Sequence, residues 1–453
     1  MSLVSNHSCP CSKTETDLFS VPPTQTDILS SQFLEYKPLN AVTSDGPLEF
    51  TVPGSPDGYL DLSQTQLYIR AKITLPDGAD IPQDAPVGPT NLFLHSMFNQ
   101  VDVHLNDRMV SVASNTYAYR AMIETLLTYG SDATKSHLTS SLFYKDTPYK
   151  MDICDPALID DEANVGLKKR AQFTHNSRVV DMVGMIHSDI FCQEKFLLGG
   201  VDLKLKLHRS KNEFCLLRGI RPQIQQPAYR VQIMDATLFV RSAKLNPTLT
   251  MSHAKELERG VTAKYPIRRV DVKSFSIPQG NLSFVRESLF TGQIPRRIIF
   301  GLVDNTAYNG AYAKNPYFFK HFNLNYLALH CNGETIPWKP LRPRFEEADA
   351  QPTLQGHIMA YQTLFQGTSN LHKDRGVQIA REDYAGGYTL FAFDLSPDAS
   401  DEAHLNLLRN GSVRLELQFQ VPLPNTVNLV VYAEWDSMLE ITKSRSIVID
   451  YDH

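Results

Sequence analysis

The sequence lacks the marks of membrane, secreted and nucleic-acid-binding proteins. No apolar run approaches the roughly 18 residues that cross a bilayer, and the opening MSLVSNHSCPCSK lacks the charged-then-apolar order of a signal peptide. Six cysteines scattered over 453 residues argue against a disulfide framework. The 44 basic residues are interspersed among 49 acidic ones, so no basic stripe supplies the field that drives nucleic-acid binding. We expect no transmembrane segment, no sequence-specific nucleic-acid binding, and synthesis in the cytoplasm or nucleus.

Common catalytic motifs are missing as well. No glycine is followed by lysine, which excludes a phosphate loop, and neither GxSxG nor HExxH occurs. No two histidines are spaced HxH, the arrangement by which a strand projects two imidazoles toward a metal. His95, His104 and His330 lie on or beside apolar segments, and we interpret each as a structural histidine. We therefore predict no catalytic, cofactor-binding or metal-binding residues, no cofactor and no enzyme activity.

Three short stretches could be read as sites, but each has a simpler interpretation. Cys9 and Cys11 have no second Cys or His pair at ligand spacing, so they indicate a tail rather than half of a metal site. A group of acidic residues lacks the alternating ligands and central glycine of a calcium loop, and indicates a solvated loop. Its members are Asp152, Asp155, Asp160, Asp161 and Glu162. The stretch LLGG at 197–200 resembles a viral or ubiquitin-type protease site, but it directly precedes a predicted strand.

What the sequence does contain favours β-structure. It has 23 Phe, 19 Tyr and 27 Pro, and short alternating segments recur between turn residues, a combination typical of β-sandwiches. At roughly 150 residues per domain the length allows two or three domains, and two large ones fit best. We predict an all-β protein with a few short helices.

One pattern of elements occurs twice in the same order. The stretch VDVHLNDRMV predicts a hairpin that turns at Asn106-Asp107, followed by a helix capped by Gly130. Much later, NLNYLALHCNGETI predicts a hairpin that turns at Asn332-Gly333, followed by a helix ending at Gly367. The predicted apolar faces are Tyr119, Met122, Ile123, Leu126 and Leu127 in the first helix, and Leu354, Ile358, Tyr361 and Phe365 in the second. Late strand pairs also correspond, so we infer an internal duplication.

The duplication divides the chain into three parts. Residues 1–44 are rich in Ser, Thr, Pro and Asn without sustained periodicity, which predicts a flexible N-terminal arm. Residues 45–250 and 251–453 each form one β-sandwich, joined near MSHAKELERG at 251–260. The polar connection over 151–178 is expected to be a surface loop.

Several long segments resemble one family. PLEFTVPGSPDGYLDLSQTQLYIRAKI, NLFLHSMFNQVDVHLND, NTYAYRAMIETLLTYG and VVYAEWDSMLEITKSRSIVIDY are similar to the double jelly-roll major capsid protein of Maverick/Polinton elements and adintoviruses. The resemblance implies two tandem jelly rolls and a homotrimer that forms a pseudo-hexameric capsomer of an icosahedral shell. It also implies contacts with neighbouring capsomers, penton and minor capsid proteins, and location in the virion, with synthesis in the host cytoplasm and the nucleus as an alternative place of assembly. The family brings no catalytic residues, and the arm over 1–44 matches nothing in it.

Two alternatives remain open at this point. A tandem β-sandwich carbohydrate-binding protein or glycosidase would need exposed aromatic platforms or a carboxylate pair. The chain has two tryptophans, Trp338 and Trp435, and both lie near predicted strands, which favours core packing. A penton or minor capsid protein would need one sandwich, and the duplication argues against it.

Overall fold

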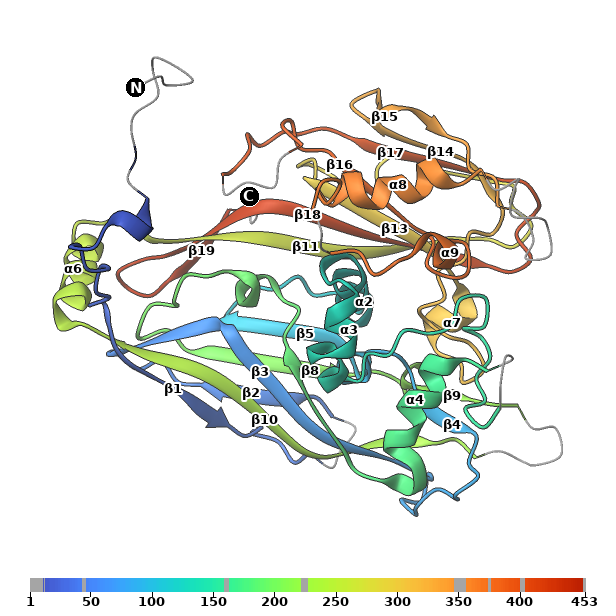
Figure 1. Cartoon of the computed structure of the whole chain (residues 1–453), viewed down its shortest axis with the longest axis horizontal. Coiled ribbons are helices and arrows are strands. Elements are labelled where there is room, and N and C mark those ends of the chain that lie inside the picture. The colour runs from blue at the N-terminus through green and yellow to red at the C-terminus, as the bar shows by residue number, and fades with distance from the viewer. Residues whose placement is uncertain are drawn as a thin grey trace.

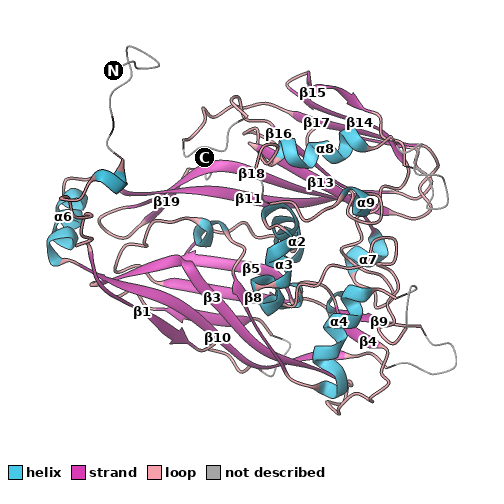
Figure 2. Ribbon diagram, in the orientation of Figure 1, coloured by secondary structure: helices cyan, strands magenta, loops and turns pink. Residues whose placement is uncertain are grey.

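Strands dominate the structure, which confirms the all-β prediction with a few short helices (Figure 2). The computed structural model describes residues 11, 13–42, 46–158, 163–220, 227–345, 356–373, 376–399 and 404–450. Long strands run the length of the molecule in Figure 1, and the helices lie between and beside the sheets.

The first half of the chain builds two facing four-stranded sheets. One has the order β1-β10-β3-β7, with β1 (Ile28–Tyr36), β10 (Arg230–Leu245), β3 (Gly58–Thr74) and β7 (Val180–Met185). The other has the order β2-β8-β5-β6, with β2 (Leu48–Val52), β8 (Leu203–Arg209), β5 (Phe98–Leu105) and β6 (Arg108–Met109). All of these pairings are antiparallel. A short pair, β4 (Val87–Pro89) with β9 (Leu216–Arg218), lies outside them.

The second half repeats this arrangement strand for strand. Its first sheet has the order β11-β18-β13-β16, with β11 (Ala263–Ile277), β18 (Val427–Ile441), β13 (Arg297–Asp304) and β16 (Leu390–Asp394), and β19 (Ile447–Ile449) pairs with β18. Its second sheet has the order β12-β17-β14-β15, with β12 (Ser283–Arg286), β17 (Val413–Phe419), β14 (Leu324–Cys331) and β15 (Glu334–Leu341). Taken in chain order, the strands of these two sheets correspond one to one to the strands of the two first-half sheets, and β19 has no counterpart. The duplication is therefore present in the topology.

The helices fill the connections. They are α1 (Phe93–Ser96), α2 (Tyr117–Thr128), α3 (Ser131–Lys135), α4 (Val165–Thr174), α5 (Asn212–Cys215), α6 (Pro247–Glu258), α7 (Asn305–Asn309), α8 (Ile358–Gly367) and α9 (Arg381–Tyr384). Short 3₁₀ turns lie at Thr14–Thr16, His137–Ser141, His175–Ser177 and Asp189–Cys192. α6 connects β10 to β11, and α2 and α8 each follow the hairpin of their own half.

The two hairpin turns match in detail. Asn106 and Asp107 both have positive φ, as do Asn332 and Gly333, which is the backbone of a type I′ turn in each case. The first turn residue also pairs with the residue before the neighbouring strand. The Asn106 side chain accepts from the backbone N–H of Asp202 at 2.7 Å, and the Asn332 side chain accepts from that of Ser412 at 3.1 Å. Both predicted hairpins are confirmed.

The prediction that residues 1–44 lie outside the sheets is wrong for 28–36. These residues form β1, which pairs with β10 from Ile28 to Tyr36 at the edge of the first sheet. Most of its side chains are exposed, and its apolar residues do not alternate with polar ones as those of a half-buried strand do. Its place is fixed by backbone hydrogen bonds to a partner some 200 residues away.

The predicted glycine cap at Gly130 is wrong, whereas the second helix ends at Gly367 as predicted. α2 ends at Thr128, and Gly130 has a φ of −87° because the chain leaves in an extended conformation and enters α3 at once. Gly367 is the last residue of α8, and a Cβ there would lie 2.4 Å from the backbone carbonyl of Ala392. This glycine is required by the close approach of β16 rather than by a left-handed turn.

The buried face of α8 differs from the predicted one. The buried residues are Ala360, Thr363, Leu364 and Gly367, whereas Ile358, Tyr361 and Phe365 are half-buried. Leu354 lies outside the described residues. The helical period was correct, but the face that packs on β16 is rotated toward small residues. In α2 the predicted face is confirmed, with Tyr119, Met122, Ile123, Leu126 and Leu127 all buried.

Candidate functional site: the seam between the two sandwiches

α2 lies between the two sandwiches in Figure 1, and we call its contacts with β11 and β18 the seam. Nine of its twelve residues are buried, because the helix is covered from both sides. Except for Tyr117, its buried apolar residues belong to the same core cluster as Val270 and Val272 of β11 and Tyr432 of β18. A helix from the first half thus completes the core of the second half.

An ionic network fixes α2 in this position. Arg120 donates to Glu124 at 2.9 Å and to Asp189 at 2.7 Å, and the Glu124 carboxylate lies 2.6 Å from Nδ1 of His187. The hydroxyl of Tyr432, from the second half, donates to Glu124 at 3.3 Å. Because unpaired charges at such sites are costly, these groups stabilise the seam only as a complete set.

Two further hydrogen bonds cross the seam. The backbone N–H of Val270 donates to the Asp189 carboxylate at 3.2 Å. The hydroxyl of Thr116, at the start of α2, donates to the carbonyl of Val272 at 2.9 Å. Both acceptor and donor on β11 are backbone groups, so the position of the strand is fixed independently of its side chains.

The pKa values of Arg120 and Glu124 are shifted in the directions that keep both groups charged. Burial alone would raise the pKa of Glu124, but Arg120 and His187 outweigh it and lower that pKa to about 2. Burial lowers the pKa of Arg120, and its two carboxylate partners more than compensate and raise it well above its usual value. Burial raises the pKa of Asp189 against the opposing effect of Arg120. The Arg120–Glu124 pair therefore stays ionised at neutral pH.

A second buried ionic network connects the two halves of the chain at a place away from α2. Arg170 is fully buried and donates to Asp146 at 2.7 Å, to the carbonyl of Pro89 at 2.9 Å and to that of Tyr144 at 2.5 Å. The other oxygen of Asp146 accepts from the side chain of Asn315 at 2.9 Å, which brings in the second half. Arg170 lies on α4, within the connection that was expected to be a surface loop. That expectation is wrong for this helix, which packs on β4.

The three histidines that were interpreted as structural are all buried or half-buried. His95 is buried, its Nδ1 lies 2.9 Å from the Tyr117 hydroxyl, and burial together with the nearby His187 lowers its pKa well below the usual value. His104 and His330 occupy corresponding positions on β5 and β14, and both are half-buried. Among the described residues, no group of three or more His, Cys, Asp or Glu side chains could hold a metal ion.

Two of the acidic residues singled out in the sequence have structural partners. Asp152 pairs with Lys320 at 2.8 Å and Lys314 at 3.4 Å, another tie between the halves. Asp155 caps the backbone N–H of Ala157. Asp160, Asp161, Glu162 and Cys9 lie outside the described residues, and Cys11 is an exposed free thiol.

The LLGG stretch is not presented to a protease in this fold. Leu197, Leu198 and Gly199 are buried. Leu197 exchanges two backbone hydrogen bonds with Leu60, of 2.7 and 3.1 Å.

The two tryptophans differ from each other. Trp435 is buried as expected, with its indole N–H donating to the Gln293 carbonyl at 3.0 Å and the Arg269 guanidinium over its ring. Trp338 was expected to pack in a core, but it is 63% exposed, because it lies on the edge strand β15. It borders a hollow of about 480 Å³ between β15 and the start of α8.

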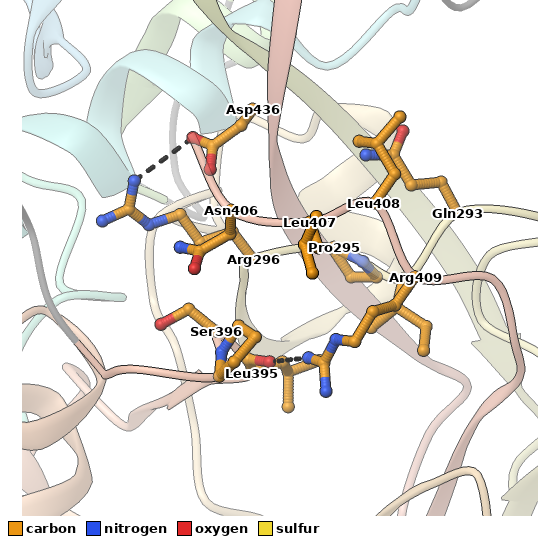
Figure 3. Close-up of a pocket in the computed structure, with 12 residues that line it drawn as sticks. Gln293, Pro295, Arg296, Leu395, Ser396, Asn406, Leu407, Leu408, Arg409 and Asp436 are labelled. Atoms are coloured by element: carbon orange, nitrogen blue, oxygen red, sulfur yellow. Dashed lines mark hydrogen bonds and ion pairs between the residues drawn. The ribbon is translucent and has the colours of Figure 1, made fainter. Parts of the chain in front are cut away.

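A second hollow lies beside Asp436 of β18, next to the segments that precede β13 and follow β16. Figure 3 shows Arg296 pointing to Asp436 and Arg409 pointing to the carbonyl of Leu395, with Leu407 and Leu408 at the rim. Its volume of about 30 Å³ is room for one or two water molecules, so it does not form a substrate site. In the described part of the chain, no helix is long and apolar enough to cross a membrane.

Comparison with solved structures decides the fold. A chain of the Sputnik virophage, solved by cryo-electron microscopy, aligns with a TM-score of 0.66 at 10% identity, covering 99% of this chain and 94% of that one. The fold is a double jelly roll. The mavirus major capsid protein aligns with a TM-score of 0.55 at 11% identity over 99% and 96% of the two chains. The PBCV-1 virus capsid gives 0.56 at 9% identity over 96% and 100%.

Sequence comparison adds one full-length relative. An uncharacterised protein of Caenorhabditis elegans is 27% identical over 439 residues, which are 95% of this chain and 99% of that protein. No protein-family model matches the chain. The alignments with solved structures confirm the predicted pair of tandem jelly rolls as a fold.

Proposed function

We propose that this protein is a major capsid protein that forms homotrimeric, pseudo-hexameric capsomers of an icosahedral shell. The observation that carries the proposal is the repeated strand order, β1-β10-β3-β7 with β2-β8-β5-β6 and then β11-β18-β13-β16 with β12-β17-β14-β15, in one chain. Three such chains present six similar sandwiches, and a six-fold outline tiles a flat facet. The full-length similarity to virophage and PBCV-1 capsid structures supports the same assignment.

The burial of the two equivalent sheets supports trimerisation. All eight residues of β13 and most residues of β18 are buried. The facing sheet of the second sandwich covers one face of their sheet, and the seam with α2 covers the other. The corresponding sheet of the first half has an open edge strand, with Leu29 and Phe33 on β1 more than half exposed. A neighbouring copy would cover this sheet as α2 covers its counterpart, which is a heterologous contact that closes into a ring.

Further parts of the proposal follow from the sequence. The chain divides into two sandwiches near 250, with α6 as the connector, and the first sandwich extends back to include β1. The segments similar to Maverick/Polinton and adintovirus capsid proteins support membership of that lineage. As a shell component it would be located in the virion, contact neighbouring capsomers, penton and minor capsid proteins, and have no enzymatic role, cofactor or sequence-specific contact with nucleic acid.

Light scattering of the purified protein tests the trimer. We expect a mass of about 153 kDa, three times the chain mass of 51.1 kDa, without added metal or nucleotide. The change Phe33→Asp should lower the trimer fraction, while Leu282→Asp, at an exposed position of the second half, should not. A wild-type mass of one chain at micromolar concentration contradicts the proposal.

A further inference from the structure

A short segment before β1 exposes three large apolar side chains. Leu18, Phe19 and Val21 are 77%, 98% and 87% exposed. The segment has local order, because Thr14–Thr16 forms a 3₁₀ turn and Asp17 accepts from the backbone N–H of Ser20 at 3.2 Å and from its hydroxyl. Burying a phenylalanine or leucine stabilises by about 1.5–3 kcal/mol, so leaving three of them in water is unfavourable unless a partner covers them.

None of the residues that the structure describes fills an apolar groove elsewhere on the chain. It is the hollow of about 480 Å³ beside Trp338, and Met359 of α8, 50% exposed, lies on its other side. Its remaining apolar lining is Pro337, Pro340, Leu341, Pro343 and Ala360. β15 is an edge strand, and its prolines lack the N–H groups that would pair with another strand. A partner is therefore held by side-chain contacts rather than by extension of the sheet.

The segment and the groove are complementary in chemistry. Val21 is followed by Pro22 and Pro23, which favour the extended conformation that aromatic- and proline-lined grooves bind. The segment carries the carboxylates Glu15 and Asp17.

The rim of the groove has the opposite charge. Lys339, Arg342 and Arg344 are exposed along and just beyond β15. Opposite charges at a rim of this kind steer and orient a partner more than they add to its affinity.

We propose that Leu18–Pro23 of one copy binds the Trp338 groove of a neighbouring copy. In Figure 1 the segment lies beside α6, whereas β15 lies on the outer sheet of the second sandwich, so the two features belong to different parts of the same chain. The inference rests on the proposed assembly and names one contact that holds copies together. Because the segment precedes β1, it can bind a neighbour without disturbing the sheets of its own copy.

Tryptophan fluorescence of the full-length protein tests the contact. Trp435 is 3% exposed and Trp338 is 63% exposed, so a change in emission on assembly reports on the groove. We expect the emission of the wild type to shift to shorter wavelength as copies assemble. Phe19→Ser should abolish this shift without changing the melting temperature, because Phe19 is 98% exposed in its own copy. Ile220→Ser, a matched change at a 72% exposed apolar position, should retain it.

Cross-linking separates a neighbouring copy from the same copy. Two proteins are mixed, one with Phe19→Cys and one with Trp338→Cys, both with Cys9, Cys11 and the exposed Cys192 replaced by serine. A thiol-reactive bismaleimide should then give a product of twice the chain mass. No product in the mixture, but an internal link in a chain with both cysteines, overturns binding between copies. An assembled wild type whose emission shift survives Phe19→Ser overturns the docking alone, and a wild type that stays monomeric overturns docking and capsomer together.

Discussion

Replacing Glu124 by glutamine removes one charge from the seam while keeping the shape of the side chain. The pKa of this carboxyl falls from 4.5 to about 2 on folding, through Arg120 and His187. At about 1.4 kcal/mol for each pKa unit, this difference stabilises the folded chain by about 3 kcal/mol when the group is ionised in both states. Because the folded pKa is the lower one, the stabilisation is present above pH 4.5 and is lost as the pH falls toward 2.

Urea unfolding of wild type and Glu124→Gln at several pH values tests this reasoning. We expect the wild type to be more stable by about 3 kcal/mol at pH 5.5 and by about half of that or less at pH 3. Glu256→Gln, which removes an exposed carboxylate paired with Arg259, should change stability by less than about 1 kcal/mol at either pH. A difference for Glu124→Gln that stays constant or widens as the pH falls would refute the account of the seam.

Three further changes test the packing. Leu126→Ala, in the fully buried face of α2, should cost about 2–5 kcal/mol in urea unfolding, and a melting temperature within a degree of the wild type would exclude the assigned face. Gly367→Ala should destabilise by about 1–3 kcal/mol because the new methyl group meets β16, whereas Gly130→Ala should be nearly neutral in the same thermal melts, since its nearest neighbour is 3.9 Å away. Removing residues 1–27 should leave the melting temperature unchanged, but removing residues 1–36 deletes an edge strand and should lower it; equal melting of the two truncations would show that β1 adds no stability.

Much of the fold could be predicted because the determining signals are local. The turn sequences around Asn106 and Asn332 require positive φ at two successive residues, and few residues other than Asn, Asp and Gly tolerate this. The apolar period of α2 fixes which face is buried. Two copies of hairpin, helix and late strands in one order then indicate the duplication, and a duplicated sandwich is what the structure contains.

The features that were missed depend on distant partners. β1 has exposed side chains and is held by backbone pairing with β10, so its sequence resembles a tail. Arg170 is buried because Asp146 and two carbonyls from other segments neutralise and satisfy it, and nothing around α4 in the sequence shows that.

The seam and the groove were missed for the same reason. Arg120 and Glu124 are four residues apart and read as an ordinary surface pair on a helix, but the second sandwich covers them. Trp338 was assigned to a core because strand tryptophans usually are buried, and its place on an edge strand depends on the order of the whole sheet. An amphipathic pattern shows that a face is covered but not by which part of the molecule.

Electron-micrograph class averages of the purified wild-type protein test the central claim most directly. The account predicts a closed particle of three chains with six similar lobes and a hexagonal outline, since each chain contributes two equivalent sandwiches. Particles with two lobes only, corresponding to a single chain of tandem sandwiches at the same concentration, would contradict the assignment as a capsomer.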